Sequence, residues 1–256
     1  MITPANINEL ATREQTSEIN IAREYLQHLF LRELYKKDGA DRFLFKGGTA
    51  IRVVYQGPRY SEDLDFSIPR MTKNEIEDIM EGTFTSLEQE GITTNLDIQE
   101  ALPTSGGYLA IIQLDILGYK VEIKSNMQVK DDSVWLIPET HVIANPFLLA
   151  YSLVALRGEL IVKEKINALI ERHKPRDVFD AYFFARHSEL RQYLPHDSET
   201  LERINKSLDE VSDHELEEAL KPFLPRNYQS IIKQLKTSVR AELGIKSGRV
   251  THLMGS

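Results

Sequence analysis

The chain has 256 residues, of which 31 are Lys or Arg and 39 are Asp or Glu, so its formal net charge is −8. This length fits one large domain or two modest ones and is sufficient for a hydrophobic core. No cysteine is present, which excludes a disulfide framework, thiolate metal sites and a cysteine nucleophile. The acidic balance argues against a general polyanion-binding protein. No apolar run is long enough to span a membrane, and residues 1–6 do not begin a secretory signal, so a cytoplasmic protein is expected.

Residues 1–144 alternate between helical and strand patterns. Apolar residues at three- and four-residue spacing predict long helices over 17–36 and 72–89. A short apolar run over 42–46 predicts a strand, which a Gly-Gly-Thr turn joins to a short helix over 50–56. Further strands are predicted from alternation and apolar runs over 63–68, 93–101, 108–117, 119–127 and 134–137. These residues are therefore expected to form a mixed α/β domain whose sheet has about five strands.

The pattern changes near residue 144. Asn145-Pro146 combines an N-cap residue with a proline suited to the first helical position. The helices predicted beyond it cover 146–157, 162–173, 175–188, 199–209, 213–221 and 227–243. The sequence thus predicts a mixed α/β domain over 1–144 and a helical bundle over 145–256, with the active cleft between them.

The stretch most informative about function joins the Gly-Gly-Thr turn to an Asp-Leu-Asp strand. Gly47 and Gly48 allow the backbone to approach a ligand, and the N–H groups that begin the next helix attract anions. Thr49 adds a hydroxyl, while Asp63 and Asp65 stand two residues apart, so both carboxylates leave one face of the strand. Each half of the pattern alone is commonly structural. Their succession indicates a holder for a metal–triphosphate complex.

Two-metal catalysis requires a third carboxylate on a neighbouring strand. The hairpin predicted over 108–127 offers Glu122 and Asp115. Glu122 is favoured because Lys120 lies on the same face of the strand and could also meet a phosphate. Asp115 remains the alternative.

A basic stretch marks the helical half. Residues 157–176 carry six Lys or Arg side chains against three acidic ones, together with one His, which makes the stretch a candidate for holding a triphosphate or an RNA backbone. A structural role is the alternative, because acidic residues in a first turn suit the helix dipole and an Arg–Asp pair at i,i+4 is common. The candidate residues are Lys165, Arg172, Arg176, Asp177 and Asp180.

These motifs resemble those of the AbiEii/AbiGii-type nucleotidyltransferase toxins, within the polymerase-β-like nucleotidyltransferase superfamily. The resemblance covers residues 44–185 and is carried by Lys46-Gly47-Gly48-Thr49, Arg59, Ser61, Asp63, Asp65, Lys120, Glu122, Lys165, Arg172, Arg176, Asp177 and Asp180. Two features depart from the family pattern. The fourteen residues 49–62 form a long connection before Asp63, and the third carboxylate is Glu where the family often has Asp.

The resemblance implies a polymerase-β-like core that transfers a nucleoside monophosphate from an NTP to RNA, at the 3′ end of tRNA, by two-metal chemistry. Mg²⁺ or Mn²⁺ would be held by Asp63, Asp65 and Glu122, and Lys165 would act with them. The nucleotide would be bound by Lys46, Gly47, Gly48, Thr49, Arg59, Ser61, Lys120, Lys165, Arg172, Arg176, Asp177 and Asp180. The resemblance also implies a toxin of a bacterial toxin–antitoxin or abortive-infection system, with a cognate antitoxin protein as partner.

Three other functions remain open on the sequence. A protein nucleotidyltransferase would use the same residues on a protein acceptor. An NTP-binding partner protein without transfer activity would keep the glycine turn but would need no third carboxylate. Arg191 and His196 have the spacing of HEPN-type ribonucleases, although Pro195 lies between them.

Overall fold

The computed structural model of the protein describes residues 2–100, 107–130 and 135–245. The chain divides into two compact units. The first comprises residues 1–161 and 221–229, and the second comprises residues 162–220 and 230–256. The chain therefore leaves the first unit, returns to it for a short segment and leaves again. The boundary predicted near residue 144 lies inside the first unit.

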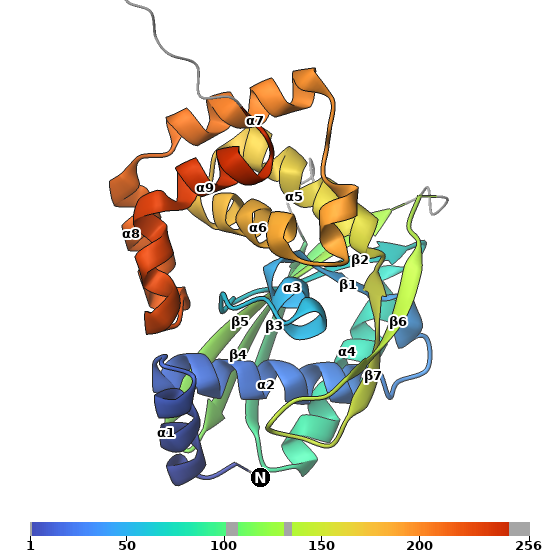
Figure 1. Ribbon diagram of the computed structural model, residues 1–256. Helices are drawn as coiled ribbons and strands as arrows, with labels where there is room; N and C mark the ends of the chain where they lie inside the picture. Colours follow the sequence, from blue (N-terminus) through green and yellow to red (C-terminus); the bar gives the residue numbers. More distant parts are fainter. Residues whose placement is uncertain (1, 101–106, 131–134, 246–256) are drawn as a thin grey trace, which may run out of the picture. The chain divides into compact units, whose positions relative to one another are not determined.

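A mixed sheet of seven strands, in the order β3-β4-β5-β2-β1-β7-β6, forms the centre of the first unit among the described residues (Figure 1). The pairs β2–β5 and β1–β7 are parallel, and the other pairs are antiparallel. The strands are β1 (Leu44–Lys46), β2 (Leu64–Pro69), β3 (Thr93–Glu100), β4 (Tyr108–Ile116), β5 (Tyr119–Lys130), β6 (Pro138–Ile143) and β7 (Tyr151–Leu156). The predicted α/β fold class is confirmed, with more strands than the five or so expected.

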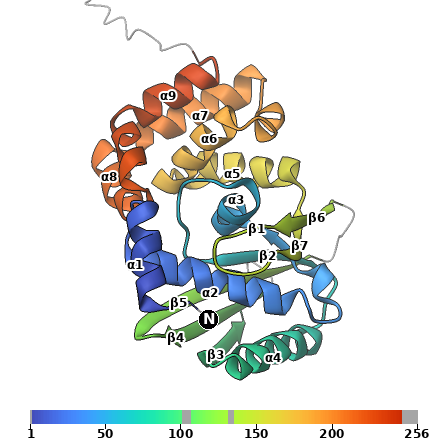
Figure 2. The same ribbon diagram turned by 60° about the horizontal axis from the view of Figure 1, so that its bottom comes forward.

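Four helices pack around this sheet: α1 (Pro4–Arg13), α2 (Glu18–Leu34), α3 (Gly47–Tyr55) and α4 (Lys73–Gln89). Helix α2 crosses the sheet, where it packs on β5 and β7 and on α4 (Figures 1 and 2). Helix α1 was not predicted, although its signal is in the sequence. Thr3 accepts a hydrogen bond from the backbone of Asn6 in a capping box, and Pro4 occupies the first turn. No helix in the described ranges is long and apolar enough to cross a membrane.

Aromatic packing fixes the two strands that carry the predicted site. The ring of Phe66 on β2 lies 5.7 Å from that of Phe43 and 5.4 Å from that of Phe45, measured between centroids. All three rings are fully buried, and burying one such side chain contributes about 2–3 kcal/mol. Because side chains alternate along a strand, the burial of Leu64 and Phe66 turns Asp65 toward the opposite face.

The helix predicted over 146–157 is wrong. Residues 151–156 form β7, with Tyr151, Leu153 and Ala155 buried on one face. Asn145 does accept hydrogen bonds as an N-cap residue would, but the segment forms a turn instead of a helix. Its Oδ1 accepts hydrogen bonds from the backbone N–H groups of residues 147 and 148. Short apolar runs do not distinguish strand from helix, and tertiary pairing with β1 decides here. The strand predicted over 134–137 begins outside the described residues; its described part precedes β6.

The second unit is helical. Within it, α6 packs against α8 and α9. Beyond the sheet the chain forms α5 (Gly158–Arg172), α6 (Pro175–Arg186), η2 (Leu190–Tyr193), α7 (Ser198–Glu210), α8 (Asp213–Leu220), η3 (Lys221–Phe223), η4 (Arg226–Gln234) and α9 (Leu235–Glu242), where η marks a 3-10 helix. The helix predicted over 227–243 is therefore a 3-10 segment followed by α9. Arg191 lies in η2, and His196 lies in the exposed segment before α7.

His28 gives the first unit a pH-dependent stability. Its side chain is 4% exposed, and its Nδ1 lies 2.8 Å from the hydroxyl of Tyr151. Burial, with a smaller effect from the positive charge of Arg52, lowers the pKa of His28 from 6.5 to about 3. The unfolded chain therefore binds a proton between these values that the folded chain does not. Stability from this residue is complete above pH 6.5 and is lost as the pH falls.

Between pH 7 and pH 5 we expect the free energy of unfolding to fall by about 2 kcal/mol because of His28 alone. Urea denaturation of the wild type and of His28→Gln at both pH values checks this. The variant is expected to show a smaller fall, since glutamine does not titrate. An equal fall in both proteins would mean that His28 does not cause the pH dependence.

Candidate active site

The turn between β1 and α3 brings the backbone against a carboxylate. Gly47 has a φ of +77°, in the left-handed region that glycine adopts without steric cost. A Cβ on Gly47 would lie 2.1 Å from Oδ2 of Asp65, far inside van der Waals contact. The helix begins at these glycines, earlier than the residue 50 that was expected. The predicted glycine turn and the predicted aspartate are thus neighbours in the structure.

The second glycine of the turn lies against the loop that precedes β2. A Cβ on Gly48 would lie 2.8 Å from Nη2 of Arg59 and 2.8 Å from Oγ of Ser61. This loop is fixed from α2, because Nε2 of Gln27 donates hydrogen bonds to the carbonyls of Ser61 and Glu62 at 3.1 and 3.2 Å. The long connection noted in the sequence therefore has a defined path, and it places Arg59 and Ser61 beside the turn.

A row of polar side chains crosses three strands at the site. Lys46 on β1 and Asn126 on β5 are the register partners of Asp65 on either side of β2. Nδ2 of Asn126 donates to Oδ1 of Asp65 at 2.9 Å, and Nζ of Lys46 donates to Oε1 of Gln128 at 2.8 Å. Sequence reasoning missed Asn126 and Gln128, although both continue the alternation of polar residues along β5. Asn126 orients the carboxylate of Asp65.

Thr49 has a different role from the one expected. Its side chain is 1% exposed, and its hydroxyl donates to the backbone carbonyl of Asp63. The hydroxyl therefore ties α3 to the start of β2 instead of facing solvent. This bond fixes Asp63 relative to the glycine turn.

The residues around the turn fit a divalent cation bound together with a nucleotide. Asp65 lies in β2 and Asp63 directly precedes that strand, two residues away, which is the spacing that places two side chains on one face of a strand. Among the described residues, no group of three or more His, Asp or Glu side chains is arranged to hold a metal ion. Mg²⁺ accepts one or two carboxylates and completes its octahedron with substrate phosphates and water. Two aspartates beside the glycine turn that begins a helix meet that requirement.

The structure does not place Glu122 opposite Asp65. Asp65 pairs with Asn126, and Glu122 lies four residues earlier on β5, about 13 Å along the strand. Asp115 on β4 is opposite Lys120. These residues line a separate pocket of about 430 Å³. Alternation identifies the face of a strand but not its register against a neighbour, so the sequence could not show that Asn126 on β5 lies opposite Asp65.

Glu122→Gln is therefore expected to leave the rate of nucleotide transfer within about threefold of the wild type, since surface changes outside a site have small effects. Steady-state kinetics with saturating NTP checks this, and Asp115→Asn is the matched control on the opposing strand. A loss of about a hundredfold in Glu122→Gln alone would place that carboxylate at the reacting centre.

An ion-pair cluster around two buried aspartates in the second unit contains four of the five charged residues predicted in the helical half, namely Lys165, Arg172, Asp177 and Asp180. Nζ of Lys165 lies 3.2 Å from a carboxylate oxygen of Asp177 and 2.8 Å from one of Asp180. Arg172 donates to both oxygens of Asp177, at 2.8 and 3.0 Å. Both aspartates are 1% exposed. The cluster joins α5 to α6. The two aspartates therefore have a structural role in holding these helices together, and this does not depend on any further role of Lys165 and Arg172.

Lys165→Met is expected to lower the free energy of unfolding by about 3 kcal/mol, because it removes the cation between two buried carboxylates. Lys163→Ala, an exposed lysine on the same helix, is the control and is expected to change stability by less than about 0.5 kcal/mol. Urea denaturation of both variants measures the difference. Equal stability of the two variants would contradict the assignment.

Comparison with known proteins agrees with this geometry. The family described as nucleotidyl transferase AbiEii toxin, type IV toxin–antitoxin system, matches residues 29–243. The chain belongs to this family. The matched residues include both the glycine–aspartate site and the Lys165 cluster. Proteins of this family are expected to have a nucleotide substrate and an antitoxin partner. A search of curated proteins finds no significant match.

Solved structures share the fold at low identity. JHP933 from Helicobacter pylori is 20% identical with a TM-score of 0.59, over 90% of this chain and 94% of that one. A putative nucleotidyltransferase from H. pylori is 19% identical with a TM-score of 0.59, over 89% and 96%. The nucleotidyltransferase toxin MenT4 from Mycobacterium tuberculosis is 18% identical with a TM-score of 0.62, over 96% and 89%. At these identities the likeness establishes the fold.

Proposed function

We propose that this AbiEii-family protein transfers a nucleoside monophosphate from an NTP to an RNA acceptor, the 3′ end of tRNA, and thereby acts as the toxin of its toxin–antitoxin pair. The observation that carries the proposal is the contact of the glycine turn with Asp65. There, backbone N–H groups suited to phosphate lie directly beside a carboxylate suited to a divalent cation.

In the proposed reaction the acceptor hydroxyl attacks the α-phosphorus of the NTP in line with the leaving group. A new phosphate ester bond forms, the bond from the α-phosphorus to the bridging oxygen breaks, and pyrophosphate leaves with the electron pair of that bond. The hydroxyl proton passes to solvent or to a site carboxylate. The rate of this reaction depends on positioning of the substrates and on stabilisation of charge in the transition state. Groups held in fixed positions therefore contribute more to catalysis than reactive side chains do.

Each residue of the site has a part in this reaction. The backbone of Gly47 and Gly48 would hold the β- and γ-phosphates, while Arg59 and Ser61 border the same turn. Asp63 and Asp65 would hold Mg²⁺, which supplies positive charge to the triphosphate when bound. Asn126 keeps the Asp65 carboxylate oriented. The resemblance also assigns Lys165, Arg172 and Arg176 of the helical unit to nucleotide binding, and this assignment stays a prediction.

The proposal is tested by incubating the purified protein with total tRNA, Mg²⁺ and each labelled nucleoside triphosphate in turn. Label from one triphosphate is expected to enter tRNA, and the label should disappear when Mg²⁺ is chelated. Label on protein instead of tRNA would mean that the protein transfers a nucleotide but that its acceptor is a protein. No label on any acceptor would leave an NTP-binding protein without transfer activity.

A further inference from the structure

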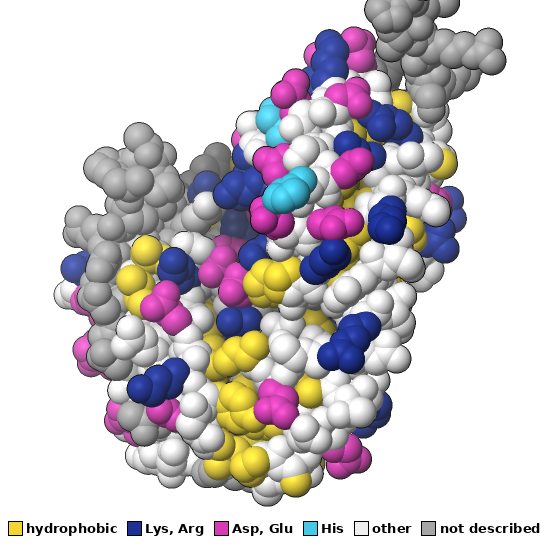
Figure 3. Space-filling view, turned by 90° about the vertical axis from the view of Figure 1, so that its left-hand side faces the viewer, with side chains coloured by type: hydrophobic (Ala, Val, Ile, Leu, Met, Phe, Trp, Pro, Cys, Tyr) yellow, Lys and Arg dark blue, Asp and Glu magenta, His cyan; other side chains and the backbone are white. Residues whose placement is uncertain are grey.

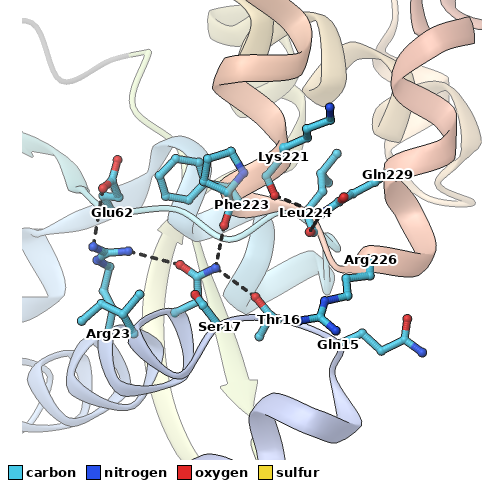
Figure 4. A pocket seen from close by; sticks show the side chains of 13 residues that line it. Gln15, Thr16, Ser17, Arg23, Glu62, Lys221, Phe223, Leu224, Arg226 and Gln229 are labelled. Carbon is cyan, nitrogen blue, oxygen red and sulfur yellow. Dashed lines mark hydrogen bonds and ion pairs between the residues drawn. The ribbon is translucent and has the colours of Figure 1, made fainter.

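A second pocket lies beside the loop of the candidate active site, within the first unit. Its volume is about 440 Å³, which is in the usual range for ligand sites. It forms where the start of α2 meets residues 221–229, the segment that returns from the helical half (Figure 4). None of the residues assigned to the site above lines it.

Hydrogen bonds to backbone carbonyls fix the walls of this pocket. Nδ2 of Asn20 donates to the carbonyl of Pro222 at 2.8 Å, and the N–H of Tyr60 donates to the carbonyl of Phe223 at 2.8 Å. The N–H of Arg226 donates to the carbonyl of Gln15 at 3.0 Å. The segment is therefore bound at three points to α2, to the turn before it and to the loop that leads into β2. These hydrogen bonds hold the walls of the pocket in place.

The charge of the lining is positive although the protein is acidic. Three cations, Arg23, Lys221 and Arg226, line the pocket against one carboxylate, that of Glu62. Arg23 and Glu62 lie 3.5 Å apart at one end, and Arg226 lies at the other end beside Gln15 (Figure 4). On the face drawn in Figure 3, basic and acidic side chains are interspersed. The lining of the pocket therefore carries an excess of positive charge, which points to an anionic ligand.

The position of the pocket relates that ligand to the active site. Glu62 lines the pocket, while Ser61 on one side of it lies against Gly48 and Asp63 on the other precedes β2. Consecutive Cα atoms are only about 3.8 Å apart. The pocket is therefore lined by the residue that directly precedes Asp63 on the same loop, and we take an RNA strand bound there to lead toward the aspartate pair. The NTP itself belongs at the glycine turn, on the other side of the loop.

We infer that this pocket binds the acceptor RNA just before its 3′ end, with Arg23, Lys221 and Arg226 contacting its phosphates. Phe223, which is partly exposed in the lining, offers a ring on which an unpaired base can stack. The inference rests on the proposed function, because it takes the acceptor to be RNA. It adds where that RNA is held and which side chains hold it.

The test uses the exposed cations, whose replacement does not disturb the core. Lys221→Glu and Arg226→Glu are each expected to raise the KM for acceptor RNA and the Kd of a labelled single-stranded 12-nucleotide RNA about tenfold at low salt, with the KM for NTP unchanged. Each should also reduce the salt dependence of RNA binding by about one counterion. Lys73→Glu, the same charge reversal at a partly exposed position on α4, is the control. Gln15→Lys adds a cation to the lining and should tighten RNA binding.

Direct binding separates this inference from the proposed function. Weaker binding in Lys221→Glu and Arg226→Glu but not in Lys73→Glu supports the pocket, even if no RNA accepts a nucleotide. Equal binding by all variants, or no binding of the 12-nucleotide RNA by the wild type, overturns it. Transfer to RNA with an unchanged KM in every variant would retain the proposed function and place the acceptor elsewhere.

Discussion

Asp65→Asn is expected to reduce nucleotide transfer by at least about 10³-fold while leaving the protein folded. The substitution keeps the size and shape of the side chain, so the contact with Gly47 is preserved. It removes the negative charge that a divalent cation needs, at the carboxylate that Asn126 orients. Replacing a charged oxygen by an amide therefore removes cation binding without opening a cavity. Single-turnover transfer with labelled NTP measures the loss.

The controls for this prediction come from the same sheet. Urea denaturation of Asp65→Asn should give a free energy of unfolding within about 1 kcal/mol of the wild type, since the side chain is partly exposed. Asp115→Asn removes a carboxylate from the same sheet, outside the site, and should retain activity. If Asp65→Asn kept more than about a tenth of the wild-type rate, the assignment of Asp65 to the cation would be wrong.

The part of the site that the sequence predicts is the part encoded locally. Gly47 and Gly48 begin α3 directly after β1, and Asp63 and Asp65 lie at the start of the next strand along the chain, so one short stretch of sequence contains all four. The antiparallel pairing of β1 with β2 places Lys46 opposite Asp65. Local pattern and tertiary structure agree here, so a single sequence is sufficient.

The rest depends on contacts between distant segments. Asn126 meets Asp65 because β5 pairs in parallel with β2 at one particular register, and a change of a few residues in that register would have brought Glu122 there instead. Periodicity carries no information on that choice. The assignment of 151–156 to a helix failed for a related reason, because pairing with β1 overrides a local pattern that suits either structure.

The return of residues 221–229 to the first unit is equally hidden in the sequence. Nothing in Lys221-Pro222-Phe223 marks it as a partner of α2, two hundred positions earlier. Its attachment uses backbone carbonyls, at Pro222 and Phe223, which any residue provides. Only the lining side chains could have suggested a site, and they come from three separate parts of the chain.

Gly47→Ala is expected to lower the rate of transfer about a hundredfold, because a displacement of about 1 Å at a reacting centre has an effect of that size. The added Cβ would lie 2.1 Å from Oδ2, 2.8 Å from Cγ and 2.9 Å from Cβ of Asp65. The aspartate side chain or the turn must therefore move. The left-handed φ of +77° adds about 1–2 kcal/mol of backbone cost for alanine.

Gly118→Ala separates these two effects. Gly118 lies in the β4–β5 turn with a φ of +84°, and a Cβ there would meet no atom within 4 Å. The control should therefore lose similar stability in urea denaturation, about 1–2 kcal/mol, with full transfer activity. Loss of activity in Gly47→Ala but not in Gly118→Ala would assign the effect to the contact with Asp65. Full activity in Gly47→Ala would mean that catalysis does not depend on this contact.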